Sequence, residues 1–176
     1  MTASFSQTLH AWQNFYTLLG EASATLTGLM FIAASLGTRL IDDQSDPKIR
    51  TFVTPTVIYF SLVLLISALM NVPDLTRPAL LVLLAGAGLF AAVYSLSHLR
   101  RLRDFNQKEI LERRAWFWNL LLPVFASLWL LGAALTLRRF FGYGLDAAAF
   151  GVVLFLLVGL HNAWDVTLRL VSLTPS

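Results

Sequence analysis

Residues 12–37 read WQNFYTLLGEASATLTGLMFIAASLG, an apolar run that is long enough to cross a lipid bilayer. A membrane-spanning helix needs about 20 mostly apolar residues. One carboxylate, that of Glu21, lies well inside this run. An ionisable side chain at such a position costs roughly 2.5 to 3.5 kcal/mol on insertion scales, and residues of this kind are functional candidates by default. The stretch therefore predicts a spanning helix whose buried acid requires a partner or a role.

Small residues follow one face of the same helix. Gly20, Ala24 and Gly28 recur at every fourth position. Small side chains allow the backbones of two membrane helices to approach closely. We therefore expect this face to pack against another helix, and we predict that it joins the subunits of a homo-oligomer.

The composition excludes a soluble globule of this size. Of the 176 residues, 57% are hydrophobic and only 13% are charged, whereas about a quarter of a typical soluble domain is charged. The mean hydropathy is +0.69. The absence of cysteine excludes disulfides and thiolate chemistry.

Four further apolar stretches follow the first. The fold class predicted from them is all-α, a polytopic membrane protein built as a bundle of five transmembrane helices in one domain, residues 1–176. A short connection predicts that the second and third spans lie side by side and antiparallel. Pro123, inside the fourth span, predicts a kink because it lacks the amide proton that would bond the carbonyl of Asn119. The five predicted spans are 12–37, 52–72, 79–98, 115–137 and 146–171.

Basic residues test this topology. With five spans, ten of the thirteen Lys and Arg residues fall on one side of the membrane, in the 38–51 loop, in the basic loop 100–114 and at Arg169. Cytoplasmic loops carry the excess of Lys and Arg. We therefore expect the N-terminus outside and the C-terminus in the cytoplasm. The outer side carries Arg77, Arg138 and Arg139.

Two groups of polar residues lie within the predicted spans. Thr25 shares a helical face with Glu21, while His161 and Asp165 are four residues apart on the fifth span, next to Asn162. These five residues are the candidate lining of a polar path for an ion or a proton, in which a carboxylate bonded to an imidazole can relay protons. The alternative is that the same residues only bond neighbouring helices together. At about 1.5 Å of rise per residue, Glu21 and Asp165 lie in opposite halves of the bilayer, so we expect no direct contact between them.

The loop 100–114 is the longest charged stretch and could bind anionic lipid headgroups. Its alternative role is only to fix the topology. Interleaved acids and the lack of a recognition fold argue against nucleic-acid binding. No cofactor or metal site and no catalytic motif is expected, so the chain is not predicted to be an enzyme. The candidate headgroup contacts are Arg100, Arg101, Arg103, Arg113 and Arg114.

The opening resembles a known group of proteins. The pattern begins with W-x-x-F-Y at Trp12 and continues as G-x-A-S-A-T-L-T-G-L-x-F-I-A-x-S-L from Gly20 to Leu36. It is similar to the first helix of small, uncharacterised bacterial integral membrane proteins. The resemblance covers under half of the chain. It implies an inner-membrane protein and no particular activity.

Two functions are compatible with these features. The first is an oligomeric channel or transporter-like protein that conducts an ion, a proton or a small solute along the polar path. The second is a non-catalytic membrane partner or scaffold that regulates another membrane complex. They differ in whether Glu21 takes part in conduction or only in helix packing.

Overall fold

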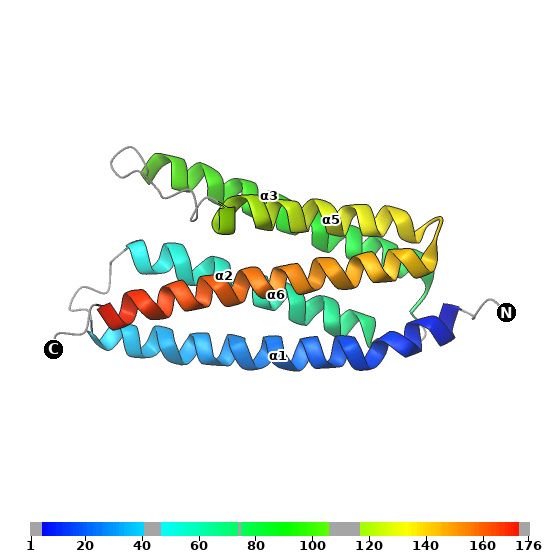
Figure 1. Ribbon diagram of the computed structural model, residues 1–176, viewed down its shortest axis with the longest axis horizontal. Coiled ribbons are helices and arrows are strands. Elements are labelled where there is room, and N and C mark those ends of the chain that lie inside the picture. Colours follow the sequence, from blue (N-terminus) through cyan, green and yellow to red (C-terminus); the bar gives the residue numbers. More distant parts are fainter. Residues whose placement is uncertain (1–4, 41–46, 74, 106–116, 173–176) are drawn as a thin grey trace.

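Helices joined by short turns make up the part of the chain described by the computed structural model, which comprises residues 5–40, 47–73, 75–105 and 117–172 (Figure 1). No strand occurs in these ranges. The elements are α1 (Phe5–Leu40), α2 (Pro47–Met70), α3 (Arg77–Phe105), the π-helical turn η1 (Phe117–Leu121), α5 (Leu122–Leu137) and α6 (Phe141–Ser172).

Four of these helices are long and apolar enough to cross a membrane. The qualifying segments are Gln7–Ser35, Val53–Met70, Arg77–Ser97 and Phe141–Leu168. The expectation of an all-α chain with several apolar helices of spanning length is confirmed, while four of the five predicted spans meet this criterion. On the same criterion α5 is a shorter apolar helix, covering Leu122–Leu137.

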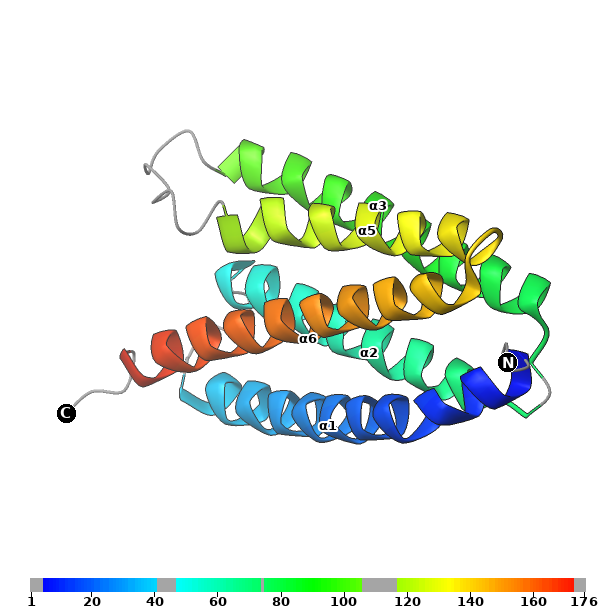
Figure 2. The same ribbon diagram turned by 45° about the vertical axis from the view of Figure 1, so that its right-hand side comes forward.

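The long helices lie roughly along a common axis, and α6 is central to the packing (Figures 1 and 2). It contacts α1, α2, η1 and α5, while α3 packs chiefly against α5. The N-terminus lies at one end of the bundle and the C-terminus at the other (Figure 1). Helices α1 and α3 lie on opposite sides of the molecule (Figure 1).

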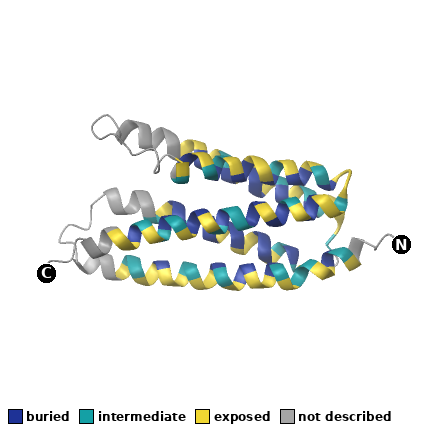
Figure 3. Cartoon of the chain, viewed as in Figure 1, coloured by how far each residue is buried: buried dark blue, intermediate teal, exposed yellow. Residues whose placement is uncertain are grey.

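Side chains fill the interior between the helices. Buried residues follow the inner faces of α2, α5 and α6 (Figure 3). The ring of Tyr59 on α2 stacks on that of Phe155 on α6, with centroids 5.9 Å apart. Many large apolar side chains are instead exposed on the outside. This distribution suits a bundle whose outer surface faces lipid rather than water.

The predicted irregularity near Pro123 is present as a π-helical turn. The turn covers Phe117–Leu121 and leads directly into α5, whose second residue is Pro123. Proline removes one backbone donor from the helical ladder, which releases the carbonyl four residues earlier. Single π-turns are a common way to accommodate such a break, and they are frequent at functional sites.

Helices α2 and α3 run antiparallel, as expected from their short connection, yet they diverge. A groove of about 510 Å³ opens between them, lined by side chains such as Leu62 and Leu65 of α2 and Val82 and Phe90 of α3. Because α3 packs chiefly on α5, the connection length set the direction of α3 but not its main neighbour.

Several helices extend beyond the predicted spans. Helix α3 extends into the predicted basic loop 100–114 and ends at Phe105. Helix α6 starts at Phe141, whereas its span was predicted to start at 146. Arg100, Arg101 and Arg103 therefore belong to α3. Arg113 and Arg114 lie outside the described residues.

Candidate functional site

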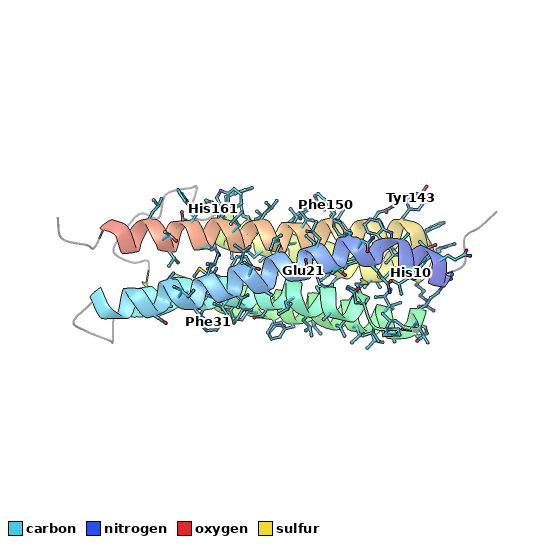
Figure 4. The ribbon with its side chains drawn as sticks, turned by 90° about the horizontal axis from the view of Figure 1, so that it is seen from below. His10, Glu21, Phe31, Tyr143, Phe150 and His161 are labelled. Carbon is cyan, nitrogen blue, oxygen red and sulfur yellow. The ribbon has the colours of Figure 1, made fainter. Side chains whose placement is uncertain are left out.

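Glu21 lies on the outer face of α1. This residue is exposed, and within the described ranges its carboxylate has no hydrogen-bond or ion-pair partner. Figure 4, which views the molecule with α1 in front, labels Glu21 midway along this helix. Thr25 is exposed on the same face, and its hydroxyl donates a hydrogen bond of 2.9 Å to the backbone carbonyl of Glu21. The protomer thus presents an acid at mid-helix without covering it.

The three small residues predicted to form the oligomer face do not share one environment. Gly20 is buried against α2, and a Cβ built at this position would lie 3.1 Å from the Cβ of Ser67. Ala24 and Gly28 are exposed, and a Cβ at Gly28 would meet nothing within 4 Å. Gly20 therefore serves packing inside the protomer, while the other two lie toward the outer surface.

His161 and Asp165 form a pair on α6. The distance from His161 Nε2 to Asp165 Oδ2 is 3.6 Å, and the two side chains are 18% and 40% exposed. This proximity follows from their spacing of four residues on a helix. The Asp165 carboxylate therefore lies within ion-pair distance of the imidazole.

Trp118 completes this cluster from a different element. Its ring stacks on the imidazole of His161 with centroids 4.0 Å apart and an interplanar angle of 27°. The π-helical turn η1 carries Trp118, so the irregular backbone before Pro123 presents the indole to α6. An indole face attracts a protonated imidazole as well as packing on the neutral one.

Asn162 lies beside this pair but turns into the core. It is 5% exposed, and its Oδ1 atom is buried without a hydrogen-bond partner in the described part of the chain. Such an oxygen is costly in an apolar interior unless something bonds to it. It is therefore a polar acceptor on the inner side of the His161–Asp165 pair.

The five predicted residues fall into two separate groups. The structure brings His161, Asn162 and Asp165 together and leaves Glu21 with Thr25 on another helix (Figure 4). The expected lack of contact between Glu21 and Asp165 agrees with this arrangement. No hydrogen bond or ion pair joins the two groups in the described part of the chain, so these polar residues form no continuous hydrogen-bonded path inside the protomer.

Sequence reasoning missed two polar contacts between α1 and α2. Ser23 is fully buried and donates a bond of 2.6 Å to the carbonyl of Phe60, and Thr17 donates to Asn71 Oδ1 over 3.1 Å. Trp118 was likewise not singled out as a neighbour of His161. The only signal for it was Pro123, which marked a break in the helix nearby.

A metal centre has no ligand set in the described ranges, where no three His, Asp or Glu side chains gather closely enough to hold an ion. No model of a known protein family, no curated protein and no solved structure matches the chain. The case for a function therefore depends on the geometry.

Proposed function

We propose that the chain is a five-span protein of a bacterial inner membrane. The span that the other four helices leave missing, the fourth in chain order, is formed by η1 and α5 together, because the five residues of η1 lead without a break into the sixteen of α5. At about 1.5 Å per residue this unit is ~31 Å long, close to the thickness of a hydrocarbon core. The resemblance of the first helix to bacterial membrane proteins supports the same location.

In this proposal the N-terminus is outside and the C-terminus is cytoplasmic. Arg77 begins α3, and Arg138 and Arg139 lie between α5 and α6, at the end of the bundle where Figure 4 labels Tyr143, whereas the predicted topology assigns the other ten Lys and Arg residues to the opposite side. This asymmetry supports the orientation through the positive-inside rule. The basic residues from Arg100 onward would then meet anionic headgroups of the inner leaflet.

We further propose that the protein assembles as a homo-oligomer and conducts an ion or a proton where α1 meets the next subunit. The observation that carries this is Glu21, an acid at mid-helix on the outer face with no partner in the described protomer. A charge facing hydrocarbon is strongly unfavourable. Coverage by another subunit would both remove this cost and place Glu21 and Thr25 beside a shared path.

The His161–Asp165 pair would serve the cytoplasmic half of this path. Its two side chains are partly exposed rather than sealed inside the protomer, so a neighbouring subunit could place them beside the same path as Glu21. Trp118 shields one face of the imidazole and leaves the edge toward Asp165 available. No catalytic step and no cofactor is part of this proposal.

The second candidate is a membrane partner that regulates or scaffolds another complex. The filled protomer interior favours it, because conduction would have to occur between subunits and not through one. In that case Glu21 would bond to a helix of the partner.

Reconstitution of the purified protein in liposomes separates the two candidates. Flux is measured for protons, Na⁺, K⁺ and Cl⁻ with wild type and with Asp165→Asn. Conduction predicts flux of at least one ion and at least a tenfold reduction in the variant. Silence of the wild type across the panel would favour the partner function.

A further inference from the structure

The outer face of α1 carries a regular seam. Within its broad exposed surface, seven residues recur at alternating intervals of four and three, the spacing typical of helices that pack along a common seam. This seam is apolar at Leu18 and Ile32 and has Glu21 near its centre. The seam consists of Asn14, Leu18, Glu21, Thr25, Gly28, Ile32 and Ser35, and it is flanked by further exposed residues such as Thr17, Ala24, Leu29 and Phe31.

The groove between α2 and α3 offers a complementary surface. It is lined almost wholly by apolar side chains, with a polar group at Ser61 and an open position at Gly86. Ser61 is exposed, and its hydroxyl has no partner among the residues that the structure describes. A Cβ at Gly86 would meet nothing within 4 Å, so another helix can approach the backbone there. The groove therefore suits a helix face that is apolar or whose hydroxyls are already bonded within the helix, as those of Thr25 and Ser35 are, with one free acceptor near the level of Ser61.

The seam and the groove lie at the same depth. Gly20 packs on Ser67, and Ser23 bonds to the carbonyl of Phe60, so Glu21 lies between these two levels of α2. Ser61 also lies between those levels, at the end nearer Phe60. Copies in one membrane share their orientation and depth, so only surfaces at equal depth can meet. The carboxylate of Glu21 can then accept a hydrogen bond from the hydroxyl of a Ser61 in the next copy.

We propose that α1 of a second copy of this chain occupies the groove between α2 and α3. The inference rests on the proposed assembly through α1 and names the surface that receives it. Two features carry it: the acceptor of Glu21 and the donor of Ser61 have no partner among the described residues and lie between the same two levels of α2, and the groove is apolar and open at Gly86. The contact joins two different surfaces of the chain, so repetition of it about the membrane normal gives a ring where the rotation between copies closes and an open array where it does not.

Cysteine cross-linking tests the contact directly, since the chain has no cysteine of its own. The variant Thr25→Cys with Ser61→Cys is oxidised in native membranes and run without reductant. We expect a ladder of dimers, trimers and larger species. The matched control pairs Thr25→Cys with Leu128→Cys, at an exposed position on α5 outside the groove. Leu128 lies about one turn from Leu131, which contacts Gly88 at the level of the groove, so the control cysteine has a similar depth. The control should remain monomeric.

Two outcomes would overturn the inference. A dimer formed by Thr25→Cys alone would mean that α1 packs on α1 symmetrically. Absence of any ladder from the double variant, with the protein folded as judged by circular dichroism, would mean that α1 does not enter the groove.

A second measurement does not depend on cysteine geometry. Gly86→Leu fills the groove, whereas Gly132→Leu adds the same bulk on α5, where a Cβ also meets nothing within 4 Å. The number of subunits per complex is counted by single-molecule photobleaching in liposomes. We expect Gly86→Leu to give mainly monomers and Gly132→Leu to match wild type, and equal counts in both variants would contradict the proposal.

These experiments separate the contact from the proposed conduction. A ladder from a protein that conducts nothing would refute conduction and retain the contact. Flux without a ladder would refute the contact and retain conduction.

Discussion

Two glycines at the start of α6 provide a matched test of the packing. Gly144 is buried against the last turn of α5, and a Cβ at this position would lie 2.7 Å from the Cα and the backbone nitrogen of Leu137. Gly142 is exposed, and a Cβ there would meet nothing within 4 Å. Because backbone atoms cannot move aside as a flexible side chain can, alanine should be tolerated at 142 and not at 144.

The difference between the two variants isolates the steric cost. Replacing glycine by alanine within a helix favours the helix by up to about 1 kcal/mol at either position. Overpacking a well-filled site costs typically about 1 to 3 kcal/mol. We therefore expect Gly144→Ala to be less stable than Gly142→Ala by about 1 to 3 kcal/mol.

The free energy of unfolding is measured in mixed micelles titrated with sodium dodecyl sulfate and followed by tryptophan fluorescence. Wild type should lie at or slightly below Gly142→Ala. Equal stability of the two alanine variants would refute the close approach of α5 and α6 at Gly144. It would also argue against the alignment of α5 along α6, which determines where η1 meets α6.

Two further predictions concern the His161 cluster and the topology. Trp118→Leu should lower the free energy of unfolding by about 0.5 to 1.5 kcal/mol, since it removes the stacking on His161. The control Trp164→Leu changes a residue that is 61% exposed and should alter this free energy little. A larger loss of stability in Trp164→Leu than in Trp118→Leu, measured in the same titration, would contradict the stacked arrangement. For the topology, a cysteine at Tyr143 should react with a membrane-impermeant maleimide in intact spheroplasts, whereas a cysteine at Lys108 should react only after permeabilisation, because the two positions fall on opposite sides of a five-span protein. Labelling of both in intact cells would exclude that topology.

Hydropathy predicted the helices well and their faces poorly. The apolar run after Pro47 and the break before Pro123 both follow from local chemistry, and each appears in the structure. The proximity of His161 and Asp165 was also predictable, since a helix alone brings residues four apart together.

Contacts between helices could not be read from the same pattern. Gly20 and Gly28 belong to one repeat, yet Gly20 packs on α2 and Gly28 is exposed. The sequence could not predict this difference, because a span that is apolar on nearly every side does not show which of its faces is buried. Trp118 and His161 are distant in sequence and meet only through the packing of η1 on α6. The length of the α2–α3 connection likewise gave no hint of the groove.

We propose above that Glu21, on the outer face of α1, takes part in conduction. The most direct test compares proton and cation flux in liposomes for wild type, Glu21→Gln and the control Glu109→Gln, which makes the same change outside the predicted spans. The account predicts flux in wild type and the control and at least a tenfold loss in Glu21→Gln, with the subunit count unchanged. Equal flux in all three proteins would contradict it.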